Sequence, residues 1–189
     1  MKKVYYYVIG AAAFLAVTFS TLWIVAVNGE VRKRNDVNEA TGAVHAGLSL
    51  RFDTIITFID AIESANATVQ GYLDTITSAR TAFAAAISAK DDALIQSEAA
   101  TIDATFINLI ALMEDNPASY NTVTLYAGFM GEFSAKTNAV NFAIDEFNRK
   151  VNLYNTHIEI FPHIIFLSGK TSFTTWPVAN YNATLPTFN

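Results

Sequence analysis

The chain opens with a long apolar stretch that carries no charge. From Val4 to Val27 it reads VYYYVIGAAAFLAVTFSTLWIVAV. As a helix this run is about 36 Å long, enough to cross a hydrocarbon core of about 30 Å. A secretory signal peptide is the alternative, but its apolar core holds only about 7–15 residues. Aromatic residues that suit the two membrane interfaces lie towards its ends, namely Tyr5, Tyr6, Tyr7 and Trp23. The pattern predicts a transmembrane anchor over residues 1–29 that crosses the lipid bilayer once.

Basic residues flank this run on both sides. Lys2 and Lys3 precede it, and Arg32, Lys33 and Arg34 follow it. Basic residues near a membrane segment tend to stay in the cytoplasm, but here two precede the apolar run and three follow it, so the bias is small. We therefore expect a single-pass membrane protein with an N-terminal anchor, and leave open which side of the membrane holds the rest.

Beyond the anchor, apolar residues recur at alternating spacings of four and three. This heptad pattern is typical of helices that pack side by side. Three such seams run through residues 48–87, 95–113 and 126–161. They predict an all-α fold, with a long up-down four-helix bundle over residues 30–162.

Polar and helix-breaking residues mark the ends of the predicted helices. Lys90-Asp91-Asp92 is expected to end one helix and cap the next, and Asn116-Pro117 to open the last one. The heptads continue in phase between residues 30 and 89, so one unbroken helix is an alternative there. It would be about 90 Å long and would leave long seams uncovered. We predict a turn near residues 66–71, with one long ascending helix, two short ones and a long descending one.

Two polar residues, Asn66 and Arg80, fall on the first seam. Polar core residues can fix the register or the oligomeric state of packed helices. The other interpretation is that both side chains are exposed at a helix end.

The last residues differ from the helices in composition. After Phe161-Pro162 the chain reads HIIFLSGKTSFTTWPVANYNATLPTFN, with Lys170 as its only charge. We expect an irregular, non-helical C-terminal tail over residues 163–189. The Ile164-Ile165-Phe166-Leu167 run is expected to rest either on the membrane surface or on a neighbouring subunit.

Composition narrows the classes of function. The chain is 52% hydrophobic and 15% charged, whereas soluble domains are about 25% charged. Its 12 Lys and Arg residues are scattered and its net charge is -5, so no nucleic-acid partner is expected. The absence of cysteine excludes disulfides, zinc-thiolate sites and a cysteine nucleophile. Weakly charged outer helix faces, as in residues 81–89 and 121–131, favour packing against copies of the same chain, and so a homo-oligomer.

The sequence contains none of the common motifs for catalysis or cofactor binding. Its histidines, His45, His157 and His163, lack the paired Glu-x-x-His spacing of di-iron bundles. Phosphate-binding loops and metalloprotease motifs are also missing. His157 and Glu159 are two residues apart on a helix, so they cannot face each other as a catalytic pair. We expect no catalytic residue, no metal ion, no cofactor and no small-molecule substrate.

Two stretches resemble the LemA family, bacterial proteins with one N-terminal membrane helix and an all-helical domain. The first is VNGEVRKRNDVNEA with VHAGLSLRFDTII, and the second comprises EFSAKTNAVNFA, FNRKV and YNTHIEIFP. The last of these is similar to the family's Tyr-Asn-Thr-x-Ile-Glu-x-Phe-Pro ending. The motif positions that we single out are Arg34, Asn35, Glu39, Arg51, Asp53, Tyr154, Asn155, Glu159, Phe161 and Pro162.

Phe52 departs from the family pattern, which commonly has tyrosine there, and the residues beyond 168 look unrelated to the family. The resemblance implies a four-helix bundle on a membrane anchor, with no established enzymatic activity. One branch of the family takes part in building magnetosome membrane vesicles. Membrane organisation is therefore the theme that the resemblance suggests.

These observations lead to three hypotheses on function. We expect a non-enzymatic, membrane-anchored helical bundle that self-assembles into a homo-oligomer and organises or scaffolds a membrane. The alternative is a membrane-tethered sensor that binds a small ligand between its helices. A pore-forming or membrane-perturbing protein is the third, and an enzyme is not expected. Tyr154, Ile158 and Phe161 are predicted to be the last core positions of the descending helix, which Pro162 ends near the bilayer.

Overall fold

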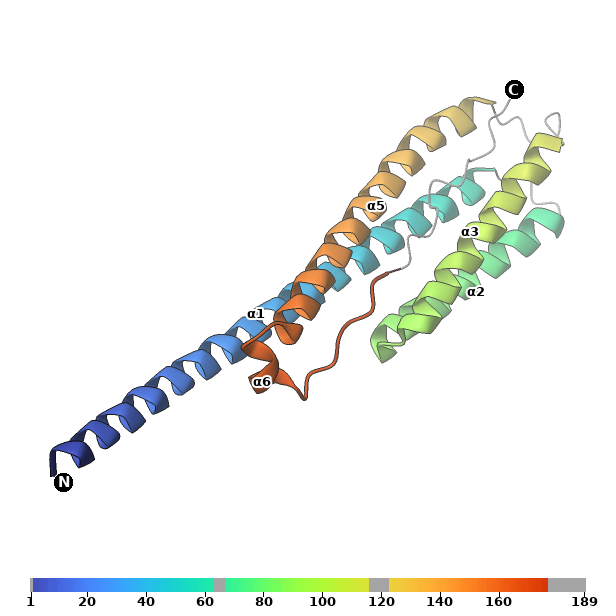
Figure 1. Cartoon of the computed structure of the whole chain (residues 1–189). Helices are drawn as coiled ribbons and strands as arrows, with labels where there is room; N and C mark the ends of the chain where they lie inside the picture. The colour runs from blue at the N-terminus through green and yellow to red at the C-terminus, as the bar shows by residue number, and fades with distance from the viewer. Residues whose placement is uncertain (1, 63–66, 116–122, 177–189) are drawn as a thin grey trace. The chain divides into compact units, whose positions relative to one another are not determined.

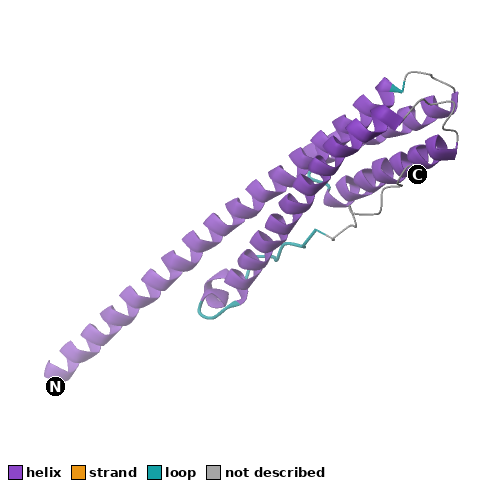
Figure 2. Cartoon of the chain, turned by 90° about the horizontal axis from the view of Figure 1, so that it is seen from above, coloured by secondary structure: helices purple, strands orange, loops and turns teal. Residues whose placement is uncertain are grey.

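The computed structural model describes residues 2–62, 67–115 and 123–176 (Figure 1). These ranges contain helices and no strand (Figure 2), which confirms the all-α prediction. The helices are α1 (Lys2–Ala61), α2 (Ala67–Ala89), α3 (Asp92–Asp115), α5 (Val123–Glu159) and α6 (His163–Leu167).

The chain divides into two compact units. Unit 1 comprises Met1–Gly42 with Ile144–Pro177, and unit 2 comprises Ala43–Ala143 with Val178–Asn189. Helices α1 and α5 each contribute to both units. The division into an anchor, a bundle and a tail at residues 29 and 162 stays a prediction.

The first long helix does not continue to residue 89. It ends at Ala61 and α2 begins at Ala67, which confirms a turn in place of one unbroken helix. The break comes a few residues earlier than expected, so Gly71 lies inside α2, and Asn66 falls outside the described residues. The lengths of α1, α2, α3 and α5, which are 60, 23, 24 and 37 residues, follow the predicted long, short, short, long order.

The turn between α2 and α3 forms where the polar run predicts it. Lys90 takes a left-handed backbone conformation with φ 57°, the geometry that commonly ends a helix. Asp91 Oδ1 accepts a hydrogen bond from the Leu94 N–H at 3.0 Å and so caps α3. The Asn116-Pro117 helix start lies outside the described residues.

Unit 2 is an up-down four-helix bundle. Phe52 of α1 lies on Phe83 of α2, with ring centroids 5.1 Å apart. Phe58 of α1 stacks on Phe129 of α5 at 4.1 Å. Along α1, Gly47, Arg51 and Phe58 lie against Val140, Thr137 and Phe129, so α1 is antiparallel to α5. Asp53, the residue after Phe52, pairs with Arg80, three residues before Phe83, so α1 is antiparallel to α2 as well. The largest fully buried side chains, nearly all on the predicted seams, are Leu48, Phe52, Ile55, Ile76, Phe83, Ile95, Ile102, Phe106, Leu109, Ile110, Met113 and Phe133.

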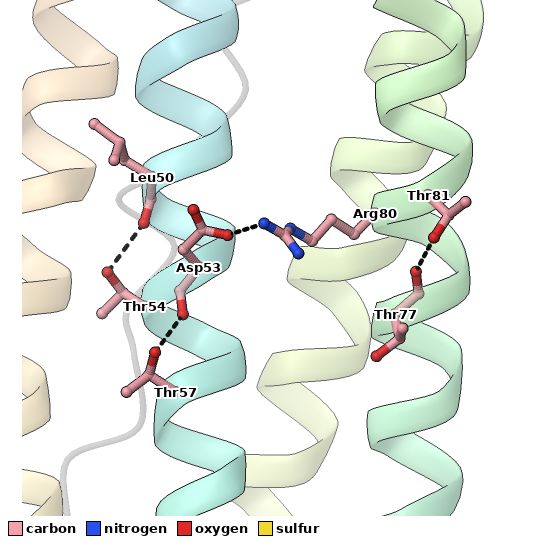
Figure 3. A network of polar contacts seen from close by, with 7 residues as sticks. All are labelled: Leu50, Asp53, Thr54, Thr57, Thr77, Arg80 and Thr81. Carbon is pink, nitrogen blue, oxygen red and sulfur yellow. Dashed lines mark hydrogen bonds and ion pairs between the residues drawn. The ribbon is translucent and has the colours of Figure 1, made fainter.

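In α2, the row of predicted core positions that contains Arg80 does not face the core. Ala79 and Ala86 are buried there, whereas Arg80 is exposed in the middle of the helix. Its guanidinium forms an ion pair with Asp53 of α1 (Figure 3). The reason is that α2 is a separate helix after the break, so its own residues set the face that it turns to the core.

Unit 1 joins the first two thirds of α1 to the last part of α5, to α6 and to an extended segment. Residues 3–24 of α1 are exposed, and α1 is the helix among the described residues that is long and apolar enough to cross a membrane. Val151, Tyr154 and Ile158 of α5 are buried as predicted. We call residues 168–176, which follow α6, the strap.

Two expectations at the end of α5 are wrong. Phe161 is not a core position, because α5 ends at Glu159 and the side chain beyond it is 80% exposed. The tail is also not irregular from its start, because residues 163–167 form α6, directly after Pro162. Proline is favourable at a helix start because its missing N–H has no partner to lose there.

Candidate functional site

A buried carboxylate stands at the centre of unit 1. Glu30 of α1 is only 1% exposed, and three groups surround its Oε1. The Tyr154 hydroxyl donates to it at 3.3 Å, Lys170 Nζ lies at 3.6 Å and Arg34 Nε at 3.7 Å. A carboxylate is buried only with such partners, because losing its hydration is costly. The charge therefore ties α1, α5 and the strap together.

Tyr154 acts here as a hydrogen-bond donor. Burial raises the pKa of its hydroxyl above the ordinary value, and the negative charge and hydrogen bond of Glu30 raise it further. The phenol therefore keeps its proton at physiological pH. It is a stable donor to Glu30 and not a candidate base.

Glu30 was missed by the motif comparison, although the heptads contain a signal for it. Counting back from Val44 in steps of seven gives Val37 and then Glu30, and all three are buried. Counting forward gives Arg51, which is also buried. A charged residue on a buried row of a long helix predicts a partner elsewhere in the chain.

His157 joins the end of α5 to α1 close to this carboxylate. Its Nε2–H donates to the Ala26 carbonyl at 3.0 Å. A side chain at position 29 would prevent this approach, because a Cβ on Gly29 would lie 2.6 Å from the His157 Cε1. His163 adds a hydrogen bond from Nδ1 to the His157 carbonyl at 3.3 Å. The last turn of α5 therefore lies beside the end of the apolar run of α1.

Two asparagines of α5 hold the strap by its backbone. Asn148 donates to the Trp176 carbonyl at 3.1 Å and accepts from the Trp176 N–H at 2.7 Å. Asn155 makes the same pair of bonds with Phe173. Seven helical residues rise about 10.5 Å and three extended residues about 10 Å, so the two spacings match. The strap therefore lies extended along α5 in a fixed register.

Aromatic contacts reinforce each of these bridges. The Phe173 ring lies 4.8 Å from the ring of Tyr154, and the Trp176 ring lies 6.4 Å from that of Phe147. Each aromatic side chain of α5 directly precedes one of the bridging asparagines. In each pair, the aromatic side chain of α5 contacts the ring of one strap residue, and the asparagine after it bonds the backbone of that same strap residue.

Unit 2 holds a second buried polar group. Arg51 of α1 forms an ion pair with Asp103 of α3, and its Nε donates to the Thr137 hydroxyl at 3.1 Å. The guanidinium also lies 4.7 Å from the centre of the Phe133 ring. Burial raises the pKa of Asp103, and Arg51 only partly opposes the shift. For the Asp103 carboxyl, the cost of desolvation therefore exceeds its attraction to Arg51.

The singled-out motif residues fall into three groups. Arg34, Tyr154, Asn155 and Glu159 meet in unit 1, where Glu159 accepts a hydrogen bond from Ser172 at 3.2 Å. Arg51 and Asp53 belong to unit 2 and form ion pairs. The remainder are Asn35 and Glu39, exposed on α1, with Phe161 and Pro162 beyond α5. The predicted anchor residues Tyr5, Tyr6, Tyr7 and Trp23 are all exposed.

The described residues contain no group of three or more His, Asp or Glu that could hold a metal ion.

The family model described as LemA family matches residues 40–186. The match extends well past residue 168, which corrects the expectation that the tail is unrelated to the family. It begins after Arg34, Asn35 and Glu39. A search of curated proteins finds no match.

Proposed function

The chain belongs to the LemA family, and on this basis we propose that it is a non-enzymatic, membrane-anchored helical bundle that self-assembles and organises a membrane. The anchor is the first part of α1. Its uncharged residues 4–24 are exposed, and a lipid bilayer covers such a surface without leaving backbone groups unpaired, because a helix satisfies its own.

The observation that carries self-assembly is the outer face of α2. We define this face as Thr77, Thr81, Ala84, Ala85 and Ser88, which are exposed, small and uncharged. The opposite side of the helix carries the buried residues of unit 2. A monomeric bundle normally covers such a face with charged side chains, so its composition supports contact with another copy.

Hydrogen bonding makes this face more apolar than its composition suggests. The Thr81 hydroxyl donates to the Thr77 carbonyl at 2.9 Å, and the Ser88 hydroxyl to the Ala84 carbonyl at 3.1 Å (Figure 3 shows the first). These hydroxyls are satisfied within their own helix. A second copy can therefore cover the face without breaking hydrogen bonds or desolvating a charge.

Helix α3, which follows α2 and forms a helical hairpin with it, has a similar outer face. Its exposed positions Ala100, Thr101, Ala104, Asn108 and Ala111 carry no charge. Thr101 also donates to its own helix, to the Ser97 carbonyl at 3.0 Å. Because α2 and α3 pack together, the hairpin offers two weakly polar faces for assembly.

Cysteine cross-linking tests this proposal, because the chain has no native cysteine. Ala84→Cys in membranes is expected to form a disulfide-linked dimer on mild oxidation. Asn38→Cys, at an exposed position of α1, is the matched control and is expected to stay monomeric. Equal cross-linking at both positions, or none at Ala84→Cys, would contradict assembly through α2.

A ligand-binding bundle is the second candidate function. A shallow groove between α2 and α3 is lined by Asp74, Ser78, Glu98 and Thr101, among others. Two carboxylates and two hydroxyls favour a small cationic ligand. A screen of cationic metabolites by thermal shift checks this, and Asp74→Asn with Glu98→Gln would abolish any genuine shift.

A further inference from the structure

We propose that α6 and the residues just before it insert into the leaflet that borders Glu30, as a second membrane contact beside α1. This inference rests on the proposed anchoring of α1. Its occupant is the lipid of that leaflet. The segment concerned is residues 160–169, IFPHIIFLSG, which we call the re-entrant segment.

The depth of this segment follows from one ring contact. Phe166 of α6 lies against Phe19 of α1, with ring centroids 4.9 Å apart. Phe19 is inside the uncharged run, four residues before Trp23, and so about 6 Å deeper along the helix. If α1 crosses the bilayer, a ring that touches Phe19 lies within the acyl chains. Interfacial helices reach a similar depth of about 5–10 Å.

The two ends of the segment lie at shallower levels. It starts just after α5, where His157 bonds the Ala26 carbonyl, seven residues nearer to the charged end of α1 than Phe19. Lys170 directly follows the segment, and its Nζ lies 3.6 Å from Glu30 Oε1. The chain therefore descends from the level of Ala26 to that of Phe19 and returns to that of Glu30.

The side chains suit lipid. Between Glu159 and Lys170 the sequence has no charged residue, and His163 is the only titratable one. Phe161 is 80% and Ile165 57% exposed, and Ile160 and Ile164 are also open. Leu167 is buried against the protein. The segment thus turns large apolar side chains outward at the depth where hydrocarbon begins.

The backbone also suits an apolar surrounding, where unpaired polar groups are costly. The Ile164 N–H donates to the Ile160 carbonyl at 2.9 Å, and the Ile165 N–H to the Pro162 carbonyl at 3.2 Å. Pro162 itself has no N–H. The Lys170 N–H closes the segment by donating to the Leu167 carbonyl at 2.8 Å.

Insertion on one side of the bilayer has a consequence for membrane shape. The re-entrant segment adds volume to one leaflet, whereas α1 adds volume to both. Such an asymmetric wedge favours curvature towards the leaflet that holds it. The segment therefore offers a physical means by which an assembly of these chains bends or organises a membrane.

Depth-dependent fluorescence quenching tests the inference on the full chain. Ile165→Cys is labelled with an environment-sensitive dye and reconstituted in phosphatidylcholine vesicles with a minor share of phosphatidylglycerol. Some vesicles carry a quencher on the acyl chain near the headgroup. Leu22→Cys on α1 is the control inside the anchor, and Asn38→Cys is the control beyond it. Circular dichroism checks that each variant folds.

We expect quenching of roughly twofold at position 165, similar to that at position 22, and none at position 38. A dye at 165 that is unquenched while the dye at 22 is quenched would overturn the inference and leave the anchor intact. A blue-shifted but unquenched dye at 165 would place the segment against a second copy and also overturn it. Absence of quenching at 22 would overturn the anchor itself.

Discussion

Asn155 of α5 holds Phe173 of the strap by both of its amide atoms. Its Nδ2 donates to the Phe173 carbonyl at 2.9 Å, and its Oδ1 accepts from the Phe173 N–H at 2.9 Å. Asn148 repeats the arrangement with Trp176. The strap is an extended segment with no sheet of its own, so these side chains supply the backbone partners that a neighbouring strand would provide.

The strap is expected to loosen when the amide loses its donor. Asn155→Asp keeps the size of the side chain but places a carboxylate against the Phe173 carbonyl, which repels it. The Trp176 side chain, only 5% exposed in the native protein, should then become more exposed to solvent. We predict a red shift of its fluorescence in a Trp23→Phe background, and a larger one when Asn148→Asp is added.

Asn152→Asp is the matched control for this experiment. It lies exposed on the same helix, between the two bridging asparagines. It should leave the Trp176 emission unchanged. Equal shifts from Asn152→Asp and Asn155→Asp would show that charge on α5, and not the lost donor, moves the strap.

The buried and exposed Arg–Asp pairs should differ in their contribution to stability. The Arg51 side chain is 5% exposed and that of Arg80 is 45% exposed, although each pairs with an aspartate of another helix. Arg51→Leu leaves the partly buried Asp103 carboxylate without its cation and should lower the free energy of unfolding by about 3 kcal/mol. Arg80→Leu should lower it by less than about 1 kcal/mol.

A double variant separates attraction from desolvation in the buried pair. Because burial already raises the pKa of Asp103, adding Asp103→Leu to Arg51→Leu should recover most of the lost stability. Chemical unfolding in detergent, followed by circular dichroism, measures all the variants. No recovery in the double variant would mean that Arg51 acts mainly through Thr137 and Phe133.

Close packing of α1 on α5 should depend on Gly29. A Cβ at this position would lie 2.6 Å from the His157 ring, so Gly29→Ala should destabilise the chain by about 1–3 kcal/mol. Gly42 lies on the same helix, and a Cβ there would meet nothing within 4 Å. Gly42→Ala should therefore stabilise α1 by about 0.5–1 kcal/mol. Thermal unfolding compares the two, and a stabilising Gly29→Ala would disprove the contact.

Acid is expected to destabilise unit 2 through His45. Burial lowers the pKa of His45 below its ordinary 6.5, and the charge of Asp92 only partly opposes this. Below pH 6.5, His45 therefore binds a proton in the unfolded chain but stays neutral in the folded chain. The free energy of unfolding falls as the pH decreases towards the folded-state pKa. His45→Gln should flatten this dependence between about pH 7 and pH 5, and Asp92→Asn should steepen it. An unchanged slope in His45→Gln would assign the acid sensitivity to other groups.

The core was predictable because burial repeats along each helix. Leu48, Ile55 and Ile76 lie on one seven-residue row and are fully buried. Local polar residues also set the turn, since Asp91 caps α3. The prediction of core positions was wrong where a helix ends, as at Phe161. The seven-residue pattern continues in the sequence past Glu159, but the helix that would place those residues in the core ends there.

The candidate site was harder to predict because it joins distant segments. Glu30 and Tyr154 are 124 residues apart, and no local pattern pairs them. The motif comparison selected Tyr154 and Asn155 correctly as notable residues, but it could not name their partners. Phe173 and Trp176 carry no periodic signal, because an extended strap on a helix has no repeat of its own.

The mass of the gently solubilised full-length protein tests the central claim most directly. Size-exclusion chromatography with light scattering, after subtraction of detergent and lipid, gives the protein mass of the particle. Self-assembly predicts a multiple of the 20.6 kDa chain mass. A particle that contains a single chain at every protein concentration would contradict the account.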